Sequence, residues 1–191
     1  MLRRRRRAAR AAGDTLLEPD GFGDVPLRRG DGITPIEVHV VDDQADFAVD
    51  ADRWAALVAG VLEAEAVHGP GEATVVFVEA DPMAALNQLH MGRTGPTDVL
   101  SFPIDAGDIT AGIDHRLVGD VVVCPSVAAA NAPDHAGTTD DEIALLLVHG
   151  TLHLLGYDHM EDDERARMWA RERELLDRLW GPLARDPWTT T

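Results

Sequence analysis

A continuous apolar segment, Ile143–Val148, runs directly into a group of three histidines. Thr139, followed three residues later by Glu142, is typical of a capping box at the start of a helix. A helix that is apolar around its whole circumference has to be enclosed by the rest of the protein. The sequence therefore predicts a buried helix over Thr138–Leu155 whose last turn carries imidazoles.

The spacing of the histidines indicates a metal site. His149 and His153 are four residues apart, so on a helix both rings project from one face. Gly156 can adopt the left-handed conformation that ends a helix, which would let His159 fold back toward the other two. Three imidazoles with an open fourth position are typical of a catalytic zinc ion. The alternative is a set of core or surface histidines that bind no metal.

The same spacing occurs in the extended zinc-protease motif His-Glu-x-x-His-x-x-Gly-x-x-His. Here Gly150 stands where that motif has its glutamate, the general base of the peptidase reaction. The sequence therefore predicts the metal ligands without the base that peptide hydrolysis needs.

Strand-like and helix-like segments alternate along the rest of the chain, which predicts one α+β domain with α/β-type layers. Apolar and β-branched patterns predict four strands, at 36–41, 73–78, 98–102 and 117–124, with a loop at 105–114 before the last of them. Helical spacing and end signals predict five helices, at 50–68, 81–90, 125–132, 138–155 and 161–180. In the last helix we expect the core contacts to come from Met168, Trp169, Leu175, Leu176 and Leu179.

We expect three regions along the chain. Residues 1–33 are predicted to form a disordered Arg-rich tail, residues 34–182 a single domain, and residues 183–191 a C-terminal tail. The arginine run in the first region could instead be a nucleic-acid-binding arm. Cys124 is the only cysteine, which excludes an internal disulfide and a cysteine-rich zinc site.

Composition bears on location and partners. The longest apolar run is far shorter than a membrane span, and no apolar segment follows Arg3–Arg7 as it would in a secretory signal. We therefore expect a cytoplasmic protein without membrane contact. The net charge is −17; residues 1–30 hold eight arginines against four acidic residues, a net of +4, which leaves −21 for the remainder. An acidic body of this kind repels nucleic acid at long range unless a local basic group compensates.

Three stretches together resemble one known family. The segment His149-Gly-x-Leu-His153-Leu-x-Gly-Tyr-Asp-His159 resembles the signature of the YbeY family of bacterial endoribonucleases. Leu86-Asn87 followed by Pro96–Pro103 resembles the family's second motif, and Gly119-Asp120 its next strand. The resemblance covers about residues 36–180.

This resemblance implies a zincin-like metal-hydrolase fold with a small, mostly parallel, mixed four-stranded sheet packed with helices. It implies one zinc ion on His149, His153 and His159, and an endoribonuclease specific for single-stranded RNA. The implied role is ribosomal RNA maturation, notably at the 3′ end of 16S RNA, and ribosome quality control. The implied partners are single-stranded ribosomal RNA and the small ribosomal subunit or its proteins.

Two further residues are candidates for the site. Many members of the family have an arginine where this chain has Met91, and Arg93, two residues later, could reach a phosphate in its place or could be an ordinary loop charge. Asp158 is expected to contact a ligand imidazole rather than the ion itself. Two other functions are kept as alternatives, namely a non-catalytic, zinc-stabilised ribosome-assembly factor and a metal-dependent, peptidase-like hydrolase.

Overall fold

The computed structural model describes residues 34–104 and 115–189. The expected tail over residues 1–33 and the expected loop over 105–114 lie outside the described residues. Within the described ranges, no helix is both long and apolar enough to span a lipid bilayer.

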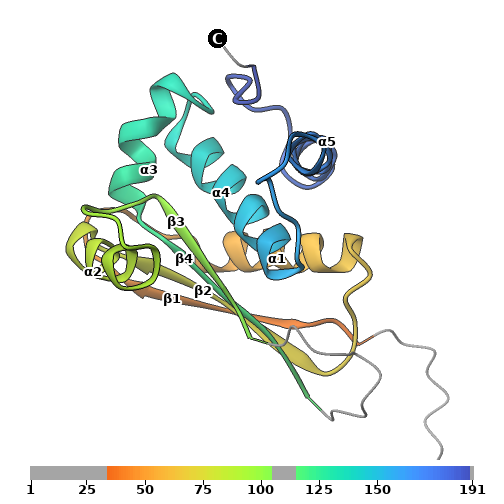
Figure 1. Ribbon diagram of the computed structural model, residues 1–191. Coiled ribbons are helices and arrows are strands. Elements are labelled where there is room, and N and C mark those ends of the chain that lie inside the picture. Colours follow the sequence, from red (N-terminus) through yellow and green to blue (C-terminus); the bar gives the residue numbers. More distant parts are fainter. Residues whose placement is uncertain (1–33, 105–114, 190–191) are drawn as a thin grey trace, which may run out of the picture. The chain divides into compact units, whose positions relative to one another are not determined.

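A mixed four-stranded sheet forms the base of the domain (Figure 1). The strands are β1 (Glu37–Asp43), β2 (Gly71–Val78), β3 (Val99–Pro103) and β4 (Arg116–Val123). They lie in the order β1-β2-β4-β3, with β1, β2 and β4 parallel and β3 antiparallel to β4 at the edge. The predicted α+β fold and its mostly parallel four-stranded sheet are confirmed.

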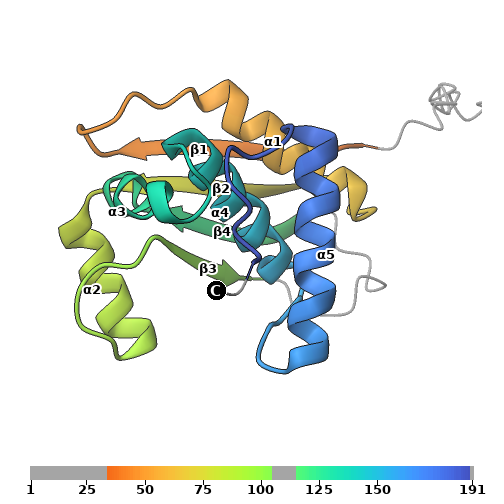
Figure 2. The same ribbon diagram turned by 90° about the horizontal axis from the view of Figure 1, so that it is seen from above.

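The helices are distributed unequally over the two faces of the sheet (Figures 1 and 2). They are α1 (Ala51–Ala64), α2 (Ala80–Met91), α3 (Pro125–Asn131), α4 (Thr139–Leu154) and α5 (Asp162–Leu179), with a short 3-10 turn, η1 (Ala132–Asp134), between α3 and α4. Alternate residues of a strand point to opposite faces. Val75 and Val121 therefore pack in the cluster that contains α1, α4 and α5, whereas Val76 and Val122 pack in the cluster that contains Met83 of α2.

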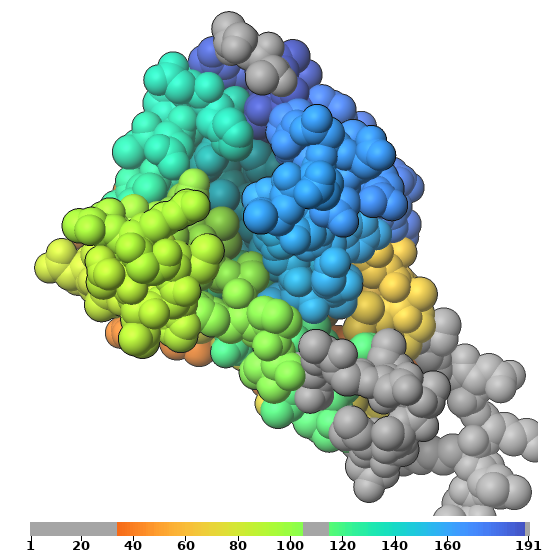
Figure 3. Space-filling view, in the orientation of Figure 1, coloured from red at the N-terminus to blue at the C-terminus, as the bar shows by residue number. Residues whose placement is uncertain are grey.

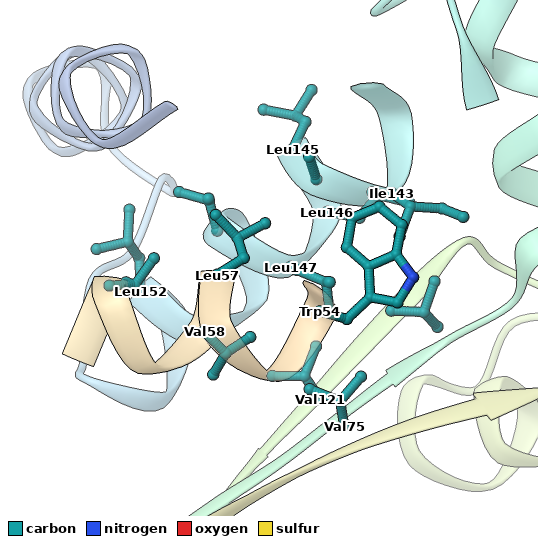
Figure 4. Packing of buried hydrophobic residues seen from close by; sticks show 14 of the residues in the cluster. Trp54, Leu57, Val58, Val75, Val121, Ile143, Leu145, Leu146, Leu147 and Leu152 are labelled. Atoms are coloured by element: carbon teal, nitrogen blue, oxygen red, sulfur yellow. The ribbon is translucent and has the colours of Figure 1, made fainter. Parts of the chain in front are cut away.

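The main core encloses α4. Eleven of its side chains or glycine positions are buried, namely Glu142, Ile143, Ala144, Leu145, Leu146, Leu147, Val148, Gly150, Thr151, Leu152 and Leu154. Figure 4 shows Leu57 and Val58 of α1 meeting this helix beside Val75 and Val121 of the sheet. Burying one such aliphatic side chain stabilises a fold by about 1.5–3 kcal/mol, so this enclosure accounts for much of the driving force for folding.

The start of α4 differs from the predicted capping box. The N-cap is Thr138, not Thr139, and its hydroxyl accepts a hydrogen bond from the backbone N–H of Asp141. Glu142 is fully buried and accepts from the backbone N–H of Ala136 and from Nδ1 of His135. The buried carboxylate therefore bonds to the turn before the helix instead of reaching back to the cap residue.

The last helix and the segment after it also differ from the expectation. Met168, Leu175 and Leu176 are buried in the core and Leu179 packs against it, but Trp169 does not belong to the core cluster. The described part of the expected C-terminal tail, residues 183–189, returns across α4 (Figure 2). It is fastened there by a hydrogen bond from the backbone N–H of Ala184 to Asp141, and by packing of Leu183 and Trp188 on the core.

Gly150 lies where α4 approaches the sheet too closely for a side chain. A Cβ atom at this position would lie 2.7 Å from Cγ1 of Val121 and 3.0 Å from Oγ of Ser101. The Ser101 hydroxyl donates a hydrogen bond of 3.0 Å to the Gly150 carbonyl, so the glycine also permits this link between β3 and α4.

We predict that Gly150→Ala lowers the free energy of unfolding by about 1–2 kcal/mol, because overpacking outweighs the gain from removing a helical glycine. The matched control is Gly60→Ala in α1, where the added Cβ meets only the mobile end of Leu179. Urea denaturation followed by circular dichroism measures both. A Gly150→Ala protein as stable as Gly60→Ala would show that α4 can move away from the sheet at little cost.

Candidate metal centre

The end of α4 brings the three histidines together. His149 and His153 stand in its last turns, and Gly156 then adopts φ +87°, in the left-handed region. The backbone N–H groups of Gly156 and Tyr157 donate to the carbonyls of His153 and Leu152, which closes the helix end. The chain consequently reverses and carries His159 back beside the helix, as the sequence predicts.

The three rings converge on one point. One ligand nitrogen from each of His149, His153 and His159 lies within 4.8 Å of the other two, and this group could hold a metal ion. The ring centroids are 4.5–5.4 Å apart. Two of the rings are half-buried and that of His159 is exposed, so the point of convergence is open to solvent on one side.

The hydrogen bonds of the two helical histidines leave their Nε2 atoms for an ion. Nδ1 of His153 lies 2.8 Å from the carbonyl oxygen of Tyr157, which can only accept, so Nδ1 carries the proton. Nδ1 of His149 lies 2.7 Å from the Glu172 carboxylate and donates to it in the same way. The two Nε2 atoms face each other at 3.1 Å. Two lone pairs at this distance need a cation or a proton between them, so the residues fit a metal ion.

The protonation state of His153 also favours metal binding. Burial, and then the neighbouring charge of His149, lowers the pKa of His153 below its ordinary value of 6.5. The neutral imidazole is the form that binds a metal, so a lowered pKa keeps this ligand available under mildly acidic conditions.

A buried carboxylate that the sequence analysis did not identify orients His149. Glu172 on α5 is 2% exposed, and its second oxygen accepts a hydrogen bond of 2.7 Å from Nε1 of Trp188. A carboxylate on the far nitrogen of a ligand imidazole fixes the tautomer and raises the basicity of the ligand. In the sequence, Glu172 is only one of several acidic residues on the helix that follows the histidines, 23 residues after His149. Neither its distance from His149 along the chain nor its charge distinguishes Glu172 from its exposed acidic neighbours.

A second network holds the turn that orients His153. The Tyr157 hydroxyl donates a hydrogen bond of 2.9 Å to Glu65, beyond the C-terminal end of α1. Arg171 on α5 binds the other oxygen of Glu65 at 2.5 Å and also the carbonyl oxygen of Ala64. The carbonyl that accepts from His153 therefore belongs to a residue anchored to both α1 and α5.

The structure places Asp158 beside the backbone of a ligand and Arg93 on the loop after α2. The Asp158 carboxylate accepts from the backbone N–H of His159 at 2.7 Å, so it supports the backbone of a ligand, whereas Glu172 contacts the imidazole. Arg93 is exposed in the loop after α2, and its backbone N–H donates to the carbonyl of Asn87. Buried Asn87 also donates from Nδ2 to Gly95, which fastens this loop.

The surface beside the segment that carries the histidines is hollowed. Figure 3 shows a hollow between α2, in yellow-green, and the blue surface of the segment that carries the histidines and the start of α5. His149 lines a cleft of about 230 Å³ between the start of β3, α4, α5 and the C-terminal segment. Two of the three histidines can therefore be reached from outside the fold, His149 through this cleft and His159 through its exposed ring.

Comparison with known proteins identifies the class. A family model described as "Endoribonuclease YbeY" matches residues 39–180, which include all three histidines and Glu172. The chain belongs to the YbeY family, and it is an endoribonuclease of that family.

Individual relatives support the assignment. Endoribonuclease YbeY of Salinispora tropica is 44% identical over 144 residues, covering 71% of this chain and 92% of the relative. The Thermobifida fusca protein of the same name is 43% identical over 141 residues, covering 71% and 90%. The solution structure of TM1509 from Thermotoga maritima has a TM-score of 0.51 and 25% identity, covering 75% of this chain and 89% of that one.

We predict that Glu172→Gln weakens metal binding by about 10- to 100-fold, with zinc as the probe, because the amide cannot supply the negative charge that polarises His149. Competition with a chromophoric zinc chelator measures the affinity. The control is Asp177→Asn, which removes an exposed carboxylate from the same helix and should leave zinc affinity unchanged. Equal affinities for wild type and Glu172→Gln would mean that the carboxylate serves packing alone.

Proposed function

We propose that this chain is a zinc-dependent endoribonuclease that cuts single-stranded ribosomal RNA during maturation, at the 3′ end of 16S RNA, and in ribosome quality control. The observation that carries the proposal is the convergence of three imidazole nitrogens in a member of the YbeY family. Its partners would be single-stranded ribosomal RNA and the small ribosomal subunit or its proteins, in the cytoplasm.

The metal and the protein would divide the chemistry. A zinc ion on the three histidines would polarise a phosphoryl oxygen of the RNA and stabilise the negative charge that develops there. The chain's own residues hold the imidazoles, since Glu172 and the Tyr157 carbonyl fix both Nδ1 protons. The Glu172 carboxylate is engaged on both oxygens, so it orients a ligand and does not act as a free base.

The glycine at position 150 disfavours the peptidase alternative. In zinc peptidases a glutamate at this position of the motif serves as the base. In this fold even an added Cβ atom at position 150 would lie 2.7 Å from Val121, so a glutamate side chain does not fit there. RNA, in contrast, carries its own 2′-hydroxyl as a possible nucleophile, so its cleavage does not require that glutamate.

Cleavage of a single-stranded RNA that spans the 3′ end of 16S RNA tests the proposal. Metal-loaded wild-type protein should cut it, and His153→Ala should lose at least about 100-fold in rate because a ligand is gone. His39→Ala is the control, since His39 lies on β1 and faces Glu72. Equal cleavage by wild type and His153→Ala would refute a metal-dependent reaction. Tight zinc binding without cleavage would favour the non-catalytic assembly factor.

Arg93 is our proposed phosphate contact on an otherwise acidic domain. The loop that carries it is fastened to buried Asn87, and its side chain is exposed. Each phosphate contact contributes to the salt dependence of RNA binding, because it releases a counterion.

We therefore predict that Arg93→Ala weakens RNA binding and reduces the slope of log affinity against log salt by about 1. Fluorescence anisotropy with a labelled RNA, measured at several salt concentrations, gives the slope. Arg178→Ala, at an exposed position in the last turn of α5, is the control. An unchanged slope for Arg93→Ala would make Arg93 an ordinary loop charge.

A further inference from the structure

We propose that the cleft beside His149 binds one unpaired nucleobase of the RNA strand, with the Trp169 indole as its stacking surface. The inference rests on the proposed ribonuclease function and assigns a substrate subsite next to the metal ligands. Five parts of the fold build the cleft, namely the start of β3, the turn between η1 and α4, α4, α5 and the C-terminal segment. It is lined by Asp98, Val99, His135, Leu145, Leu146, His149, Trp169, Glu172, Pro187 and Trp188.

Trp169 is placed as a binding residue rather than as a core residue. Its neighbour Met168 is fully buried, whereas Trp169 is half-buried, lies outside the core cluster and faces the cleft. The guanidinium of Arg165 lies 5.7 Å from the centre of its ring. A large aromatic side chain that leaves the core to line a cleft offers a face on which another flat group can stack.

Trp188 forms part of the same wall and is held rigidly. Its Nε1 donates to Glu172, and the Arg173 guanidinium lies 4.6 Å from the centre of its ring. The segment before it is tied down by the backbone N–H of Arg185, which donates to the carbonyl of Ala136. Trp188 lies beyond residue 180, where the match to the family model ends.

The charge and the volume of the cleft favour binding of a base over binding of a phosphate. The ionisable groups in the cleft wall are two carboxylates, Asp98 and Glu172, and two imidazoles, with no arginine among the lining residues. Carboxylates repel a phosphate, but an uncharged base can stack on an indole whatever its identity. The volume of about 230 Å³ is smaller than the roughly 300–1,000 Å³ typical of sites for drug-sized ligands, which suits a single base.

The cleft shares His149 with the metal site, so a base bound in the cleft would belong to the RNA strand that reacts. His149 lines the cleft and is also one of the three ligands, whereas His153 and His159 are not among the lining residues, so a base in the cleft would lie on the other side of the His149 ring from the metal. A base held there would position its own nucleotide for cleavage. It would also select single-stranded RNA, because a paired and stacked base cannot enter.

Binding of a short 2′-O-methyl RNA, which cannot be cut through its 2′-oxygen, tests the inference by fluorescence anisotropy. Trp169→Leu removes the stacking surface, and the loss of this contribution to the binding free energy should raise the dissociation constant by about tenfold. Trp169→Phe keeps an aromatic face and should stay within about threefold of wild type. Zinc affinity should be unchanged in both, because Trp169 contacts neither Glu172 nor a ligand through any hydrogen bond found in the described residues.

A series of the same oligonucleotide with one abasic residue at each position in turn locates the base. At one position the abasic change should weaken wild type but not Trp169→Leu, which is the signature of a direct contact. Equal binding of the intact strand by Trp169→Leu and wild type would overturn the inference and leave the ribonuclease proposal standing. The absence of any single-stranded RNA binding or cleavage by wild type would overturn both.

Trp188→Phe separates stacking from support of the metal. It keeps an aromatic ring, although a smaller one, and removes the hydrogen bond to Glu172, so it should weaken zinc binding while Trp169→Leu does not. If Trp169→Leu lowered zinc affinity as much as Trp188→Phe, both residues would act by supporting the metal, and the stacking role would be refuted.

Discussion

The enclosure of α4 is the constraint on which the rest of the structure depends. This helix is apolar over nearly its whole surface, so the sheet, α1 and α5 have to cover it before the domain can be stable. The same helix ends in two imidazoles, which cannot be buried without partners. Its approach to the sheet is close enough that a side chain at position 150 would be overpacked against Val121 and Ser101. Fold stability and the metal site therefore depend on one helix, and the residue that permits the packing also removes the peptidase base.

The ligands are held by residues that are distant in sequence. His149 depends on Glu172 of α5 and, through it, on Trp188 in the C-terminal segment. His153 depends on the Tyr157 turn, which Glu65 links to α1 and to Arg171. Both chains of contacts pass through α5, so this helix positions the metal site as much as it covers the core. The last described residues consequently contribute to the site although they lie past the end of the expected domain.

Local periodicity in the sequence predicts most of the fold and the core of the site. The four strands, the five helices, the three converging histidines and the turn at Gly156 need only spacing and end signals, and all are present. The sequence does not reveal the contact of Glu172 with His149, and it wrongly predicts Trp169 as a core residue, because the surroundings of both side chains depend on which element packs beside them. On α5 Glu172 resembles several exposed acids, and Trp169 lies next to core residues at helical spacing. The N-cap was misplaced by one residue because two threonines stand side by side and only the packing of Glu142 distinguishes them.

The most direct test of this account is anomalous diffraction at the zinc edge from crystals of the purified, zinc-loaded protein. The account predicts one peak about 2.0–2.1 Å from a ring nitrogen of each of His149, His153 and His159, with the fourth position open to solvent. No peak between the three rings would contradict it. A peak with a fourth protein ligand would also contradict it, because a closed site of that kind holds the fold together and leaves no place for a phosphate.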